Sequence, residues 1–180
     1  KWDGERFSNN TLKERDKPLT FNHLLTRIRF EACKKKNEGL PVTIQKVTVN
    51  ETKTQAIVPL ATGEPSFNTP SGGTAGLSLT PADGSNEVAS TTPVELGSLM
   101  LAPLGGNEGV EYTLTVETST GIYNNVKITY SDTQSSEILK AGISHVVTLT
   151  LSDYALSITS ITVEPWKLIE AGDLGIGERK

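Results

Sequence analysis

The stretch Pro18–Lys36, PLTFNHLLTRIRFEACKKK, shows most directly how this chain folds. Its middle alternates charged with apolar side chains, one residue at a time: Arg27, Arg29 and Glu31 against Ile28, Phe30 and Ala32. Successive side chains of a β-strand point to opposite faces, so this period predicts a strand with one buried face. A polar Asn22-His23 pair precedes the run, and three lysines open a loop after it.

The same two-residue period recurs along most of the chain. Alternating runs on both sides of Ser119-Thr120-Gly121 predict a β-hairpin. A second pair of runs, 147–151 and 156–163, predicts another hairpin. The period slips by one residue at Gln45-Lys46 and at Thr159-Ser160, as a β-bulge would cause.

Other segments lack this regularity. Residues 61–93 are rich in Gly, Pro, Ser and Thr, so we expect a long loop with one strand around Leu77–Leu79. No stretch keeps a helical period. About seven or eight half-buried strands are typical of antiparallel sheets packed on one side. The sequence therefore predicts an all-β antiparallel β-sandwich.

Composition narrows the function classes. The 180 residues carry a net charge of −4, which argues against a nucleic-acid partner. No apolar run approaches the ~20 residues of a membrane span. Cys33 is the only cysteine, so it has no internal disulfide partner, and we expect either a small strand hydrophobe or a half-exposed thiol.

The chain contains no recognisable catalytic, metal or cofactor motif. His23 and His145 are its only histidines, and neither has metal-ligand spacing. Asp83, Ser85 and Glu87 resemble a calcium loop but lack a third carboxylate at the expected place. We therefore expect no enzyme, no metal and no cofactor, and a binding or building role instead.

Several motifs together resemble those of the fimbrillin-like family, the pilin and adhesin subunits of Bacteroidales. Residues 19–23 and 27–30 are similar to the family's F-x-H…I-x-F start, and Leu99–Pro103 is similar to its central strand. Leu139-Lys140-Ala141-Gly142 and the run 145–151 resemble the family's "aG-x-x-Y-x-x-x-L-x-L" signature, with His145 at the aromatic place. Ile161–Trp166 resembles its closing I-x-x-W strand.

The resemblance implies a transthyretin-like sandwich with Greek-key connections, exported to the cell surface, usually as an outer-membrane lipoprotein. It implies a fimbrium subunit that joins other pilus subunits by β-strand addition, and a structural role for Asn22 and His23. Members have two domains. We therefore expect residues 1–17 to be a linker or the end of an upstream domain, 18–168 the domain itself, and 169–180 a tail.

The tail has two interpretations. Leu168, Ile169, Leu174 and Ile176 could anchor a donor strand, or residues 168–180 could be a frayed polar terminus. A host or bacterial surface ligand is a second possible partner, through loops 61–93 and 131–138. The alternative function is a carbohydrate-binding module, which would need an aromatic platform that the distant Trp2 and Trp166 do not suggest. An enzyme on the same fold ranks third.

Overall fold

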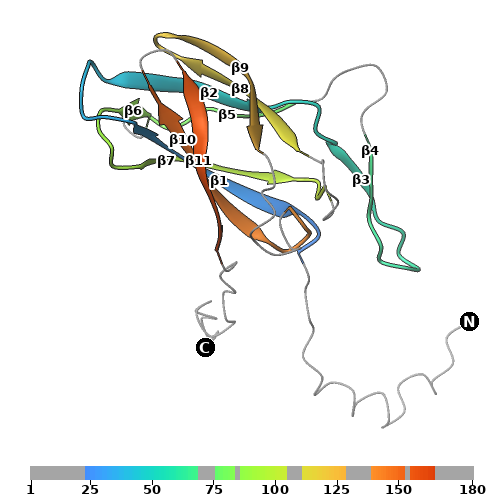
Figure 1. Cartoon of the computed structure of the whole chain (residues 1–180). Coiled ribbons are helices and arrows are strands. Elements are labelled where there is room, and N and C mark those ends of the chain that lie inside the picture. The colour runs from blue at the N-terminus through green and yellow to red at the C-terminus, as the bar shows by residue number, and fades with distance from the viewer. Residues whose placement is uncertain are drawn as a thin grey trace, which may run out of the picture.

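The computed structural model describes residues 23–68, 76–83, 86–104, 111–128, 139–152 and 155–164. Within these ranges the chain is all-β, with eleven strands and no helix. It follows that no helix in this part of the chain could cross a membrane. The strands form three sheets, two of which share a core (Figure 1).

The first sheet has the order β11-β10-β1-β7. Its strands are β1 (Thr26–Lys34), β7 (Val94–Leu101), β10 (Ser144–Leu151) and β11 (Leu156–Glu164). β1 is central, antiparallel to β7 but parallel to β10. The expectation of purely antiparallel pairing was therefore wrong for this pair. Only strands joined by a tight turn must reverse direction, and the whole second sheet lies between β1 and β10 along the chain.

The second sheet contains the predicted hairpin. Its order is β5-β2-β8-β9, with β6 also paired to β2, and its bounds are β2 (Val42–Val49), β5 (Leu77–Leu79), β6 (Glu87–Val88), β8 (Tyr112–Thr118) and β9 (Gly121–Ile128). Ser119 and Thr120 make the turn between β8 and β9. The register of β2 shifts between Ile44 and Lys46, and that of β10 against β11 shifts near Thr159. Both predicted phase slips are confirmed.

The third sheet is a short hairpin, β3 (Gln55–Ile57) with β4 (Ser66–Asn68). It stands apart from the two larger sheets (Figure 1). Residues 61–93 thus hold β4, β5 and β6, and the expectation of one strand in this region was wrong, as was the total of seven or eight. Strands of two or three residues are too short to show a period, and their pairing depends on neighbours distant in sequence.

The core forms where the two larger sheets face each other. From β1 it takes the predicted Ile28, Phe30 and Ala32, all fully buried, and it continues through β2, β8 and β10. Burial of one such large apolar side chain contributes roughly 1.5–3 kcal/mol. Cys33 is buried, so of the two expectations for it the small strand hydrophobe holds.

The charged side of β1 faces outward and ties three strands together. Arg29 lies 3.1 Å from a Glu31 oxygen, 2.9 Å from one of Glu95 on β7 and 3.1 Å from one of Glu164 on β11. The hydrogen bond that Arg29 donates to the Glu95 carboxylate raises the pKa of Arg29, so the guanidinium stays charged. The alternation in β1 therefore separates an apolar core from a polar outer surface.

Candidate functional site

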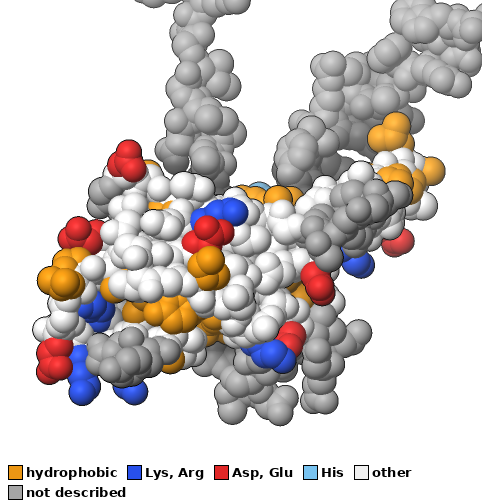
Figure 2. Space-filling model, turned by 90° about the horizontal axis from the view of Figure 1, so that it is seen from above, with side chains coloured by type: hydrophobic (Ala, Val, Ile, Leu, Met, Phe, Trp, Pro, Cys, Tyr) orange, Lys and Arg blue, Asp and Glu red, His pale blue; other side chains and the backbone are white. Residues whose placement is uncertain are grey.

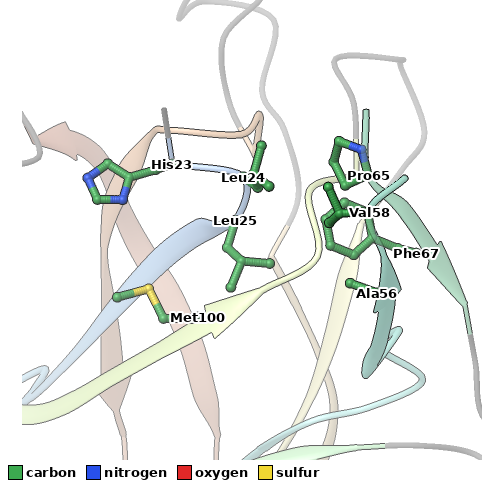
Figure 3. Close-up of a pocket in the computed structure, with 8 residues that line it drawn as sticks. All are labelled: His23, Leu24, Leu25, Ala56, Val58, Pro65, Phe67 and Met100. Carbon is green, nitrogen blue, oxygen red and sulfur yellow. The ribbon is translucent and has the colours of Figure 1, made fainter. Parts of the chain in front are cut away.

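An open apolar groove lies between the first sheet and the β3–β4 hairpin. It encloses about 630 Å³. One wall consists of His23, Leu24 and Leu25, where the chain enters β1, with Met100 near the end of β7. The facing wall comes from the hairpin and its flanks: Ala56, Val58, Pro65 and Phe67. Figure 3 shows the two walls opposite each other across the gap.

The groove leaves apolar surface in contact with water. Leu24, Val58 and Met100 remain 37%, 43% and 44% exposed. On the hairpin beside the groove, Ile57 and Leu60 are also exposed, and Figure 2 shows hydrophobic side chains at the outer end of the molecule where the hairpin lies. Among the described residues that line the groove, His23 is the only titratable one. Such a lining suits apolar side chains of a partner and offers no acid–base pair or nucleophile.

The groove adjoins an edge of the first sheet. β7 is the terminal strand of that sheet in the described residues, and Met100 belongs to it. An edge strand presents backbone N–H and C=O groups that can pair with another strand. A free strand edge and an apolar groove therefore lie side by side.

A turn at residues 139–143, directly before β10, holds one wall of the groove in place. This is the wall that contains His23, Leu24 and Leu25, called the inner wall below. The Gly142 N–H donates to the Leu25 carbonyl at 2.9 Å. The Ile143 carbonyl accepts from the Arg27 N–H at 3.0 Å and from the Thr26 hydroxyl at 3.1 Å. At the other end of the turn, the Leu139 N–H donates to Nε2 of His145 at 3.0 Å. Residues 139–145, the segment singled out by its signature, thus fix the start of β1.

Of the residues singled out from the sequence, one lines the groove, one is buried in the first sheet, and several lie outside the described residues. His23 lines the groove, whereas His145 is fully buried in the sheet. The tail residues Leu168, Ile169, Leu174 and Ile176 lie outside the described residues, as do Asn22, Ser85, loop 131–138, Trp2 and Trp166. The hairpin wall was not predicted from the sequence as part of a site. Its signal was an apolar run, Ala56-Ile57-Val58, followed by a polar, glycine-rich segment.

A second hollow, on the second sheet, is polar. It encloses about 490 Å³ and is lined by Thr48, Asn50, Glu51, Gly76, Thr113 and Asn125. Among the described residues, no three His, Cys, Asp or Glu side chains are grouped so that they could hold a metal ion. None of the aromatic residues in the described part of the chain lines this hollow, so these residues give it no stacking surface of the kind typical of a sugar site.

Comparison with protein families identifies the chain. The model of the family described as fimbrillin-like matches residues 7–166 of the 180. The chain belongs to the fimbrillin-like family. No match was found among curated proteins.

Solved structures resemble this fimbrillin-like chain at low sequence identity. A "putative cell adhesion protein" from Bacteroides ovatus is 18% identical, with a TM-score of 0.50, over 83% of this chain and 47% of that one. Another so described, from Bacteroides uniformis, is 18% identical, with a TM-score of 0.52, over 82% and 53%. The tip fimbrial protein Mfa3 from Porphyromonas gingivalis is 11% identical, with a TM-score of 0.43, over 81% and 52%. The chain thus spans about half the length of these structures.

Proposed function

We propose that this chain is a structural or adhesive subunit of a bacterial surface pilus, and that it assembles by β-strand addition without catalysis. Family membership supports the class. The observation that carries the mechanism is the apolar groove beside the free edge of β7. In strand addition, backbone hydrogen bonds to an edge give affinity, and pockets for alternate side chains give register.

The proposed partner is another pilus subunit of the same or a related type. Its C-terminal tail would supply the added strand, with Leu168, Ile169, Leu174 and Ile176 as anchors. The position of the last described strand supports this assignment. Glu164, Ser144, Arg27 and Met100 stand in one row across the first sheet, so the chain leaves β11 at the same end of the sheet as the groove.

The rest of the assignment follows the family. We propose that residues 18–168 form one transthyretin-like sandwich domain, that 1–17 are a linker or the end of an upstream domain, and that 169–180 are the tail. The protein would be exported to the cell surface and anchored at the outer membrane as part of a fimbrium. Its exposed loops would contact a host or bacterial surface ligand.

Deletion of residues 168–180 tests the mechanism. We expect the shortened chain to fold with an unchanged far-ultraviolet circular dichroism spectrum, because all eleven strands end before residue 168. It should remain monomeric by size-exclusion chromatography under conditions in which the full chain polymerises. Polymers that persist after the deletion would contradict the role of the tail, while leaving the family-based class intact.

A further inference from the structure

The side chain of His145 accepts a hydrogen bond inside the first sheet. It is fully buried on β10, where its register neighbours are Ile28 of β1 and Val163 of β11. Its Nε2 accepts the Leu139 N–H at 3.0 Å, so the neutral ring carries its proton on Nδ1. Nδ1 is buried and has no hydrogen-bond partner among the residues that the structure describes. The ring is therefore held in one tautomer by a single backbone donor.

Leu139 makes this contact from an unusual backbone conformation. Its φ of 61° lies in the left-handed region, which is uncommon for a residue other than glycine. Its N–H binds His145, and its carbonyl accepts the Leu104 N–H at 3.0 Å. Leu139 thereby joins β10 to the segment that follows β7. The buried side chain of Leu139 adds to this anchor, at 3% exposed.

The turn that begins at Leu139 connects it to the groove through backbone hydrogen bonds. Gly142 binds the Leu25 carbonyl, and Ile143 binds both Thr26 and Arg27, so the turn fixes the chain where it forms the inner wall. The backbone of His23 also lies against Gly142: a Cβ added to that glycine would be 3.6 Å from the His23 carbonyl oxygen. Loss of the Leu139 anchor would therefore free the turn and, with it, residues 23–25.

We infer that protonation of His145 opens the inner wall of the docking groove, and we call the hydrogen bond between His145 and Leu139 the latch. When a proton is added to Nε2, the ring becomes a donor that faces the Leu139 N–H, a second donor, in a fully buried place. The hydrogen bond is lost, the turn 139–143 opens, and the inner wall of the groove loosens. Acidic conditions open the wall and neutral conditions hold it closed. The inference rests on the proposed function for the role of the groove, although the latch itself can be measured without a partner.

The direction of the pH dependence follows from the surroundings of His145. Burial lowers its pKa in the closed form, while in the open form the ring regains its ordinary value near 6.5. The open form therefore binds the proton more strongly, so the closed form is fully favoured above about pH 6.5 and loses ground as the pH falls below it. The population of the open form should grow below pH 6.5, by at most about tenfold per pH unit.

Other titratable groups near the latch do not provide this response. Arg27, Arg29 and Glu31 of β1 and Glu164 of β11 alternate onto the opposite, outer face of the sheet. Burial raises the pKa of Tyr112 on β8, so that phenol stays protonated. Lys140 lies within the turn, next to Leu139. That leaves His23 beside Gly142, the one other histidine in the chain, as the control.

Hydrogen exchange monitored by NMR on the full chain tests the latch. Protection factors, corrected for intrinsic exchange, would be compared at about pH 7.5 and about pH 5 for the amides of Leu139, Gly142 and Arg27. We expect them to fall by as much as about 30-fold, the limit that a ring pKa of 6.5 in the open form sets for 1.5 pH units. Amides in the β8–β9 hairpin should keep their protection. If each of these amides has the same protection factor at both pH values in the wild-type chain, the inference is overturned, and no variant is needed to show it.

Two substitutions identify the group responsible. His145→Gln keeps an acceptor for the Leu139 N–H but does not titrate, so its protection should be independent of pH. His23→Gln should keep the wild-type response. A response that survives His145→Gln or disappears in His23→Gln overturns the latch. If His145→Gln does not fold, the titration of the wild-type His145 ring by NMR decides, because an ordinary pKa near 6.5 in the closed chain would exclude the device.

A binding measurement separates this inference from the proposed function. The probe is a synthetic peptide of residues 165–180 added to the chain that lacks residues 168–180. An absence of binding at both pH values would contradict the docking role while the exchange result stands. Binding that is equal at both pH values, together with a confirmed exchange response, would show that the latch does not control the groove and would overturn that part of the inference.

Discussion

At the residue scale, one glycine sets how closely the two larger sheets approach. Gly97 on β7 has a φ of 130°, and a Cβ there would lie 2.9 Å from Cδ1 of Leu79 on β5. Its partner Phe30 stands beside a shift in the register of β1 and β7. A side chain at Gly97 would therefore meet both an unfavourable backbone conformation and a neighbour from the other sheet.

Gly97→Ala should consequently destabilise the chain by about 1–3 kcal/mol, the usual cost of such a backbone conformation. Urea unfolding measures this loss. Gly121→Ala is the matched control, because a Cβ at Gly121 has open space around it. Equal stability of the two variants would show that Gly97 is not a point of close approach.

The sequence predicts residues on long strands well, and side chains at close contacts poorly. The burial of Phe30 follows from the alternation around it, because a period of two assigns every side chain of a strand to a face. His145 occupies an inward position of the run 144–151, yet its bond to Leu139 depends on a turn conformation that no local pattern indicates. Local periodicity determines the face, whereas tertiary geometry determines the partner.

At the element scale, the β3–β4 hairpin has too little buried surface to be explained by its own packing. Two-stranded hairpins are marginal alone in water. Ile57 and Leu60 are 60% and 101% exposed, so they add little to the fold. The side of the hairpin that faces the first sheet supplies the outer wall of the groove. A docking role accounts for apolar side chains that folding does not require.

Val58→Lys tests that wall. A charge placed in the groove would have to lose its water when a partner docks, so we expect polymerisation and binding of the 165–180 peptide to fall at least tenfold. Val58 is 43% exposed, so stability should change by less than about 0.5 kcal/mol. Leu60→Lys adds the same charge to the same hairpin outside the groove lining and should assemble normally. Equal behaviour of the two variants would remove the hairpin from the docking site.

The short strands β4, β5 and β6 are the elements that the sequence predicts least well. The hairpin β8–β9 and both bulges were predictable because each run is long enough to show its period and its slip. β4, β5 and β6 have two or three residues, and they form because β2 and β3 offer them partners. The groove could not be predicted, because one of its walls depends on the placement of these short elements.

At the scale of the whole molecule, the arrangement of strand ends favours a subunit that joins to others. The edge of β7, the groove and the exit of the chain from β11 all lie at one end of the first sheet. A chain that receives a strand and gives one from the same end can form a linear assembly with repeated copies, since a head-to-tail contact need not close on itself. The parallel pair β1–β10, which alternation alone could not predict, places the start of β10 beside the start of β1 at this end.

The alternation of the tail itself gives the last prediction. In an added strand, Leu174 and Ile176 would face the groove, while Gly175 and Gly177 would face away. Leu174→Asp with Ile176→Asp should therefore prevent polymerisation in light scattering. Gly175→Asp with Gly177→Asp adds equal charge to the opposite face and should permit it. If both double variants fail alike, charge rather than register governs assembly. If full-length chains stay monomeric and refuse the added 165–180 peptide, the tail occupies the groove of its own chain instead, and subunits must join through another surface.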